Sequence, residues 1–363
     1  MPAWVAGGPA DVLGRPTPWD IWPPQRALSG YLECKAALTD PGLTTDPYLA
    51  SVTDRPSHNL LLMEGPEHRA LRSLIAPFMT PEATARLAPS LNVARDRYLG
   101  RLLEVGHGDL IADFVEPLVF DAVCLSCGVP STERSQVRAS LQAMLGSLEP
   151  AGSPQERAPQ ASTRIMRVMH KQATDGDDRG LYRQLLDARA SGAIGKGAAR
   201  FTMPVVLHGA YENPLNYLGH IVATAVEEPE AFAAAARRWP DGVREEILRL
   251  LPPVRGVLRW DRVGAGMGSG SAGEPLWIDL ESANRDQEQL DSPSRPDYAN
   301  PGRHLSFGYG AHRCPGVNLA KLLGSLLIDG LLQLPYRSLS AATVERHIES
   351  VTQGVTKAIV VDL

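Results

Sequence analysis

The chain has 363 residues, 44% of them hydrophobic, and a formal net charge of −5 at pH 7. This composition predicts an ordinary globular protein with enough apolar material for a large core, and its mild acidity gives no sign of a nucleic-acid partner. No apolar run approaches the length of a membrane span, and the N-terminus lacks the charged and apolar regions of a secretory signal. We therefore expect a cytoplasmic protein with no membrane partner.

The first half of the chain predicts an irregular start followed by helices. Residues 1–29 are rich in proline, glycine and tryptophan without sustained periodicity, so we expect them to be irregular. From Tyr31 the sequence predicts a helix, a turn at residues 40–42 and a loop through Ser57. Residues 83–200 predict several helices. Joints rich in glycine and serine separate them at residues 147–153 and 190–196.

Four cysteines are present, and two of them allow alternative interpretations. Cys124 and Cys127 form a CxxC spacing, which occurs in zinc sites and in redox centres. The surrounding VFDAVCLSCGVP is an apolar helix end without a second CxxC or paired histidine nearby, so we favour core packing. Cys34 lies in a short amphipathic helix and is expected to be a small buried hydrophobe.

Residues 63–83, MEGPEHRALRSLIAPFMTPEA, predict a helix that Gly65 and Pro66 open. His68 and Arg72 are four positions apart and therefore share one face of this helix. Two such donors on one face suit a carboxylate that accepts charge-assisted hydrogen bonds. Taken alone, the pair fits a solvated helix face better.

Residues 203–229 are apolar on nearly all faces, which predicts a long buried helix. Gly209 and Ala210 are small enough for a ligand to approach the backbone, and the acidic Glu212 follows them. Pro214 removes one helical hydrogen bond, so we expect a kink that leaves the carbonyls near Gly209 and Ala210 to water. Asn213 can donate a hydrogen bond but is not a proton acid.

Residues 238–260 predict a helix that ends at the Pro252-Pro253 pair. Glu246 and Arg249 are three positions apart and can form an ion pair, which on an isolated helix would be a minor surface contact.

Two hairpins are expected in the last third of the chain. The glycine-rich run 264–274 is interpreted as a hairpin loop, because the βαβ context of a nucleotide-binding GxGxxG is missing. Residues 351–363 predict a terminal hairpin with Gly354 at its turn.

The most informative segment is residues 304–320, HLSFGYGAHRCPGVNLA. Gly308, Gly310 and Gly316 permit backbone angles that side chains forbid, so this segment can fold tightly beneath a flat ligand. Cys314 precedes a helix N-terminus, where free N–H groups favour a thiolate. Such a thiolate is an iron ligand, and haem is the usual group that supplies the iron. The alternative is a buried structural cysteine in a glycine-rich turn.

The pattern Phe307-Gly-x-Gly-x-His312-x-Cys314-x-Gly316 matches, at every fixed position, the haem-binding loop of cytochromes P450, and the chain resembles that family over about residues 30–363. The resemblance implies the P450 fold, mainly helical with a small β part, as a single domain over residues 30–363. Haem b would lie between the buried helix, the family's I-helix, and the Cys314 loop. Microsomal members carry an N-terminal anchor, so its absence indicates the soluble bacterial type.

The resemblance also implies roles for single residues. Cys314 corresponds to the axial iron ligand. Glu246 and Arg249 correspond to an ion pair behind the haem that a later arginine joins, for which Arg295 is our candidate. The residues expected at the haem are His68, Arg72, Arg259 and His312 on its propionates, Gly209 and Ala210 on its distal face, and Phe307, Gly308, Cys314 and Gly316 in the loop.

The buried helix departs from the family pattern Ala/Gly-Gly-x-Glu/Asp-Thr-Thr. Aligned on Glu212, this chain has Asn213 and Pro214 where the family has threonines. The first threonine helps deliver protons to oxygen, so its replacement puts the usual relay in doubt. We assign catalytic roles to Glu212 and Asn213, with water at the Pro214 kink or a substrate hydroxyl as further proton sources.

The resemblance implies a monomeric haem-thiolate monooxygenase. It would use O2 and electrons from a ferredoxin and its reductase to hydroxylate or epoxidise a small secondary metabolite. The ferredoxin is expected on the Cys314 side, where Arg313 and Lys321 are candidate contacts. Two alternatives stay open: a coupling or ring-forming P450 that transfers no oxygen, and a non-catalytic haem-thiolate protein. The intact Glu212, Cys314 and propionate ligands argue against the last.

Overall fold

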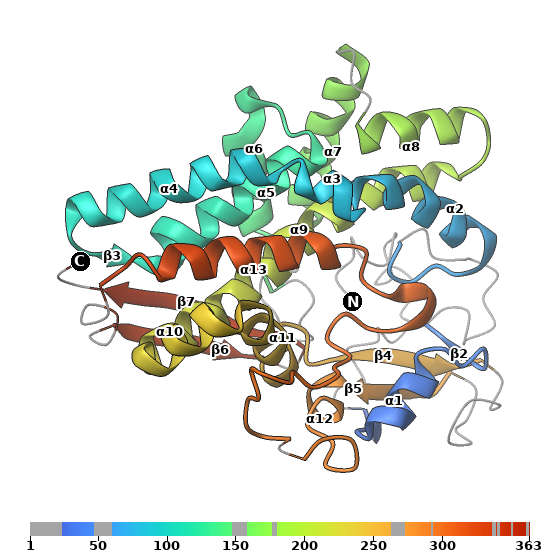
Figure 1. Cartoon of the computed structure of the whole chain (residues 1–363). Helices are drawn as coiled ribbons and strands as arrows, with labels where there is room; N and C mark the ends of the chain where they lie inside the picture. Colours follow the sequence, from blue (N-terminus) through green and yellow to red (C-terminus); the bar gives the residue numbers. More distant parts are fainter. Residues whose placement is uncertain are drawn as a thin grey trace.

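Helices dominate the computed structural model, which describes residues 24–46, 60–146, 158–175, 180–262, 273–291, 293–335, 339, 342–349, 351–360 and 363 (Figure 1). The α-helices are α1 (Tyr31–Ala37), α2 (Gly65–Ile75), α3 (Pro81–Ala85), α4 (Ala88–Val105), α5 (Glu116–Cys127), α6 (Arg134–Gln142), α7 (Ala158–Asp175), α8 (Leu181–Ala190), α9 (Lys196–Glu227), α10 (Pro229–Arg238), α11 (Pro240–Leu250), α12 (Leu280–Ala283) and α13 (Val317–Leu331). Shorter turns are the 3₁₀ segments Ala76–Phe78, Ser131–Glu133 and Gly310–His312 and the π segment Leu110–Val115. None of the described helices is long and apolar enough to cross a bilayer.

Two small sheets accompany the helices. The first has the order β1-β5-β4-β2 and consists of Arg26–Leu28, Pro275–Asp279, Gly256–Asp261 and Leu43–Thr44. The second has the order β3-β7-β6 and consists of Gly108–Asp109, Gln353–Val360 and Thr343–Ile348. The antiparallel pairing of β4 with β5 confirms the predicted hairpin, whose loop at residues 263–272 lies outside the described residues.

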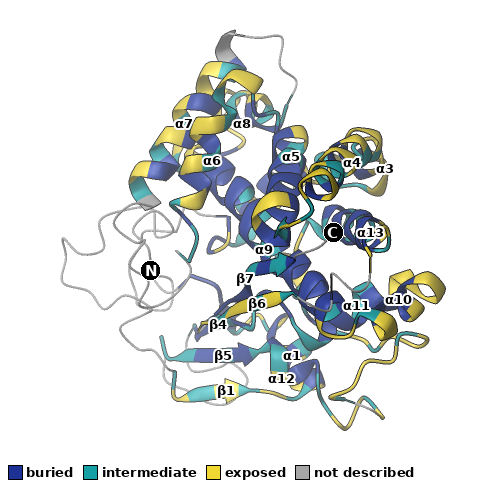
Figure 2. Ribbon diagram, turned by 90° about the vertical axis from the view of Figure 1, so that its left-hand side faces the viewer, coloured by how far each residue is buried: buried dark blue, intermediate teal, exposed yellow. Residues whose placement is uncertain are grey.

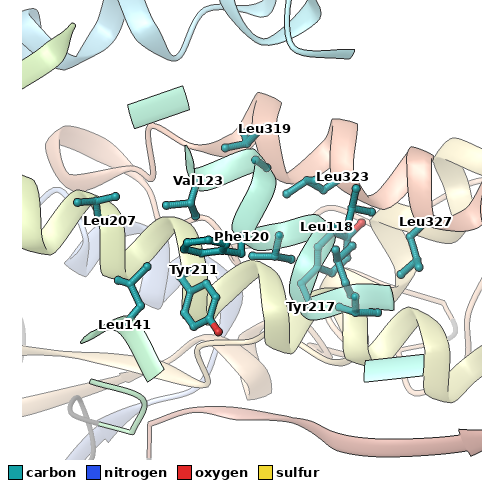
Figure 3. Close-up of a cluster of buried hydrophobic side chains, with 14 of the residues drawn as sticks. Leu118, Phe120, Val123, Leu141, Leu207, Tyr211, Tyr217, Leu319, Leu323 and Leu327 are labelled. Atoms are coloured by element: carbon teal, nitrogen blue, oxygen red, sulfur yellow. The ribbon is translucent and has the colours of Figure 1, made fainter. Parts of the chain in front are cut away.

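Helix α9 is the centre of the core, as its apolar sequence predicts. It is largely buried, whereas α4 and α10 expose their outer faces (Figure 2). Leucine and aromatic side chains from α5, α6, α9 and α13 gather around it (Figure 3). Pro204 and Pro214 both lie inside α9, which continues through them. Core side chains therefore fix the position of residues 209–214 in this helix.

The cysteines outside the 304–320 loop are core residues. Cys34, Cys124 and Cys127 are all buried. Burial raises the pKa of the Cys34 and Cys124 thiols to about 12 and that of Cys127 to about 11. The CxxC pair thus consists of protonated thiols packed in α5, which confirms the packing interpretation.

Residues 1–23 of the segment expected to be irregular lie outside the described residues. Residues 26–28 form the short strand β1 because β5, some 250 residues later, offers a parallel edge, with Arg26 opposite Leu276.

One expectation about the sheets was wrong. Gly354 does not form a turn; it lies in β7 opposite His347, and the turn spans the residues before it. A side chain at Gly354 would collide with Asn216 of α9, so this glycine permits the helix to approach the sheet.

Candidate active site

The loop before α13 has the tight geometry that its glycines predict. The N–H of Cys314 donates to the carbonyl of Phe307 (2.8 Å), and the N–H of Gly308 donates to Leu305 (2.7 Å). Gly308 and Gly310 have φ angles of +66° and +75°, which other residues rarely adopt. The loop thus holds Cys314 by main-chain hydrogen bonds rather than by side-chain packing.

A hollow of about 520 Å³ opens beside Cys314. The thiol is accessible there, and Arg72, Met79 and Arg313 contribute to the walls. The recessed position raises the pKa of the Cys314 thiol, against the lowering effects of the Gly316 backbone and of the Arg72 and Arg313 charges. The helix N-terminus therefore does not lower this pKa on its own as the sequence led us to expect, because desolvation outweighs it. Iron coordination would supply the missing stabilisation of the thiolate.

Four basic side chains from three segments converge near this loop. His68 and His312 stack with ring centroids 4.3 Å apart, and Arg72 donates to the Arg313 carbonyl (2.6 Å). Arg259 is buried, and its guanidinium donates to the Leu258 carbonyl (2.8 Å). Burial, His68, Arg259 and Arg72 together lower the pKa of His312 to about 3. The structure therefore brings together the four residues that the sequence analysis assigned to one anionic ligand.

The cluster fits the carboxylates of a haem. None of the four forms an ion pair within the described part of the chain, and Nε2 of His312 is buried without a partner there. Burial also lowers the pKa of Arg259 to about 10. A buried guanidinium without a counter-charge is costly, and a bound carboxylate would satisfy Arg259 with charge-assisted hydrogen bonds.

Replacing one of these donors should weaken haem retention without abolishing it. We expect Arg259→Leu to accelerate haem loss by about tenfold to a hundredfold, because one charge-assisted hydrogen bond contributes about 1.5–3 kcal/mol. The measurement is the rate of haem transfer to apomyoglobin. Arg101→Leu on the exposed face of α4 is the matched control. Equal rates for the two variants would remove Arg259 from the haem site.

On α9, Gly209 and Ala210 are half-buried, and a methyl group added at Gly209 would meet no atom within 4 Å. The space beside Gly209 is therefore open enough for a ligand to lie against the helix backbone. Pro214, four residues after Ala210, leaves the Ala210 carbonyl without its helical donor. The kink itself stays a prediction.

The two residues that the sequence marked as catalytic lie in different environments. Glu212 is buried and accepts a hydrogen bond from the Gly146 N–H (2.7 Å), while Nε2 of His208 lies 2.8 Å from its other oxygen. Although burial alone would raise it, His208 and Gly146 lower the pKa of Glu212, so the carboxylate stays ionised. Asn213 is half-buried, and its Oδ1 has no partner among the described residues. Oδ1 of Asn213 is thus available for a new contact, whereas Glu212 is held by its ion pair with His208 and by the Gly146 N–H, although its Oε2 makes no hydrogen bond among the described residues.

Glu246 and Arg249 form a buried bidentate ion pair. Nε and Nη2 of Arg249 lie 2.8 and 2.7 Å from the two Glu246 oxygens. Glu246 also accepts from the N–H groups of Asp297 and Gly302. The expectation for Arg295 was wrong: its side chain is exposed, and its main-chain carbonyl accepts from Arg249 (2.9 Å). Main-chain groups therefore complete the network in place of a third side chain.

The sequence analysis missed Asn284, which joins this network to the Cys314 loop. Its carbonyl accepts from Arg249 (3.0 Å), and its side chain accepts from the Leu305 N–H (2.7 Å) and donates to Ser306 (2.8 Å). The only available signal was its place in residues 280–286, LESANRD, which resemble the Ala-Asn-Arg-Asp that follows the strands in bacterial P450s. Lys321 was expected to be a surface contact, but it pairs with Glu245 (2.9 Å). Together with His304, this ion pair counters burial and lowers the pKa of Glu245 to about 2.

Comparison with known proteins agrees with this geometry, although no family model matches the chain. Cytochrome P450 107B1 of Saccharopolyspora erythraea is 27% identical over 337 residues, which cover 86% of this chain and 82% of the relative. Cytochrome P450 monooxygenase PikC of Streptomyces venezuelae is 26% identical over 348 residues, 90% of this chain and 81% of the relative.

Solved structures show the same fold. P450BioI, solved in complex with an acyl carrier protein, matches with a TM-score of 0.80 at 23% identity, and the match covers 93% of this chain and 92% of that one. The loop motif, the fold and the curated relatives lead to one conclusion: the chain is a cytochrome P450 of the bacterial type, an oxidoreductase whose cofactor is haem b.

Proposed function

We propose that the chain is a haem-thiolate monooxygenase that hydroxylates or epoxidises a small secondary metabolite with O2. The observation that supports this most is the position of Cys314, held by a glycine-rich loop beside four basic side chains that lack ion-pair partners in the described part of the chain. PikC, a relative over most of both lengths, is named a monooxygenase.

Each residue of the Cys314 loop and of the basic cluster beside it has a role in this function. Cys314 would hold the haem iron through its thiolate, and a haem held in this way would supply the chemistry of O2 activation. His68, Arg72, Arg259 and His312 hold the propionates. Phe307, Gly308 and Gly316 shape the loop, and a methyl group at Gly316 would lie 3.7 Å from Sγ of Cys314. The protein itself would position the substrate, exclude bulk water from the site and supply protons.

On the opposite side, Gly209 and Ala210 leave room for oxygen and substrate. Glu212 is bound to His208 and Gly146, which makes it a poor direct proton donor. Asn213 occupies the position of the family's threonine, and its free amide oxygen can hold a water molecule or a substrate hydroxyl. We therefore infer that Asn213, rather than Glu212, holds the group that gives the last proton to oxygen.

Variants of Asn213 test this assignment. Asn213→Thr should keep measurable activity, because a hydroxyl also binds water. Asn213→Leu should divert electrons from product to hydrogen peroxide and lower the coupling by about a hundredfold or more, since positioned proton transfer contributes about 10²–10⁴. The measurement is the ratio of product to peroxide for each NADPH consumed. Equal coupling in wild type and Asn213→Leu would exclude Asn213 from proton supply.

Electrons would come from a ferredoxin and its reductase, docked over the hollow beside Cys314. Arg313 is exposed there, and Arg72 lines the same wall. These cations suit an acidic electron donor. Lys321 is less suited, because Glu245 neutralises it.

A second function remains a candidate because Asn213 replaces the hydroxyl of the usual relay. A coupling or ring-forming enzyme abstracts hydrogen from its substrate and transfers no oxygen to it, and both oxygen atoms of O2 leave as water. Turnover of a panel of small metabolites with a surrogate ferredoxin and reductase distinguishes the two. A product heavier by one oxygen atom supports the monooxygenase. A product lighter by two hydrogens supports coupling, and haem loading without any product would indicate the non-catalytic alternative.

A further inference from the structure

A polar stripe runs along α9 away from Asn213. Asn213, Asn216 and His220 are three and four positions apart, so their side chains follow one another along one face of the helix. This stripe faces the β6–β7 hairpin. Nε2–H of His220 donates to the Gln353 carbonyl (3.3 Å), and a methyl group at Gly354 would collide with the Asn216 side chain.

His347 of β6 lies at the same junction. A methyl group at Gly354 would lie 2.8 Å from Cε1 of His347, so His347 and Asn216 both border this glycine. His347 acts electrostatically on Glu212 and on His220, which places it within reach of both. Its side chain is partly exposed, whereas Asn216 and His220 are buried. The stripe therefore reaches solvent at His347.

The side chains of this stripe leave buried polar atoms unsatisfied. Within the described part of the chain no hydrogen-bond partner is available to Asn213 Oδ1, Asn216 Nδ2, His220 Nδ1 or His347 Nδ1. An unsatisfied buried group costs about 1–3 kcal/mol, so four along one helix face and the hairpin opposite are unfavourable unless water binds to them. Donors and acceptors are both present, which a water molecule with two to four polar partners requires.

His220 presents a hydrogen-bond acceptor to water on such a path. Burial lowers its pKa to about 4, against the Gln353 carbonyl and Glu281, and with help from the nearby Arg346 and His347. The ring is therefore neutral at pH 7. Because Nε2–H donates to a carbonyl, Nδ1 is the free acceptor.

We propose that His347, His220 and Asn216 line a water-filled path that carries protons from solvent to Asn213. The inference rests on the proposed function and specifies its proton source. Monooxygenation consumes one O2, two electrons and two protons, with one oxygen atom entering the product and the other leaving as water. The electrons arrive from the Cys314 side, and the path supplies the protons from the other side of the haem. It replaces the relay that the missing threonine would have served.

The test uses the haem-loaded protein as its reduced carbon monoxide complex, with asparagine and histidine isotopically labelled for NMR. We expect saturation of the water signal to transfer to the side-chain amide of Asn216. His347→Phe should slow this exchange by about tenfold or more, because it closes the solvent end. His347→Gln, which keeps a polar side chain, should restore it. His107→Gln, on an exposed histidine beside β3, is the control.

Two results would overturn the path: an Asn216 amide that does not exchange with water in the wild type, or equal exchange in His347→Phe and the wild type. The absorbance band of the carbon monoxide complex, recorded on the same samples, reports haem ligation separately. An intact band with a protected Asn216 removes the path and leaves the proposed function standing. A missing band in the wild type contradicts the haem-thiolate assignment itself, whatever the exchange shows.

Discussion

Cys314→Ala is expected to abolish the long-wavelength absorbance of the reduced carbon monoxide complex. That band requires a thiolate on the iron, and among the described cysteines Cys314 alone is accessible. Cys34, Cys124 and Cys127 are buried in the core, where no haem can reach their sulfur atoms, so none of them can take its place.

Cys127→Ala is the matched control, because it removes a sulfur from the core of α5 without touching the loop. It should retain the band and lose only some stability, as small core truncations do. A Cys314→Ala protein that keeps an unchanged band would show that another group ligates the iron. The haem would then have to be placed elsewhere in the fold.

Glu246→Ala should destabilise the protein by about 3–5 kcal/mol, the usual cost of removing one partner from a buried ion pair. Glu246 and its partner Arg249 are each about 1% exposed. The substitution would leave the Arg249 guanidinium without its carboxylate and the Asp297 and Gly302 N–H groups without an acceptor. The measurement is the free energy of unfolding from urea denaturation of the haem-loaded protein.

Asp187→Ala provides the comparison, because Asp187 pairs with Arg183 at 3.1 Å on the surface of α8. Exposed pairs contribute about 0–1 kcal/mol, so this change should have little effect. Equal stability of the two variants would show that the hydrogen bonds of Glu246 to Arg249, Asp297 and Gly302 do not stabilise the contact between α11 and the segment before the Cys314 loop.

Local patterns in the sequence predicted the parts of the site that depend on short spacings. The glycine positions of the Cys314 loop, the shared face of His68 and Arg72 and the pairing of Glu246 with Arg249 all follow from spacings of a few residues. The structure shows each of these local arrangements. In each case backbone geometry fixes the outcome over one or two turns.

The errors concern contacts between distant segments. Arg295 matches a family position, but nothing local reveals that its carbonyl, rather than its guanidinium, faces Arg249. Gly354 was read as a turn residue, whereas the close approach of Asn216 from α9 explains it. Such contacts depend on the tertiary fold, which local propensity does not encode.

The polar stripe of α9 was hidden for a related reason. Averaged over its length the helix is apolar, and the sequence analysis did not single out Asn216 and His220 within it. Only the hairpin opposite, with Gln353, Gly354 and His347, makes them one cluster. A sequence pattern can show which residues share a face but not what that face meets.

The most direct test of the monooxygenase assignment is turnover under isotopically heavy dioxygen, with a surrogate ferredoxin and reductase and each candidate metabolite in turn. We expect a product that gains one heavy oxygen atom, while the second atom appears as water. A product that has lost two hydrogens and carries no label would contradict oxygen transfer and identify the chain as a coupling P450.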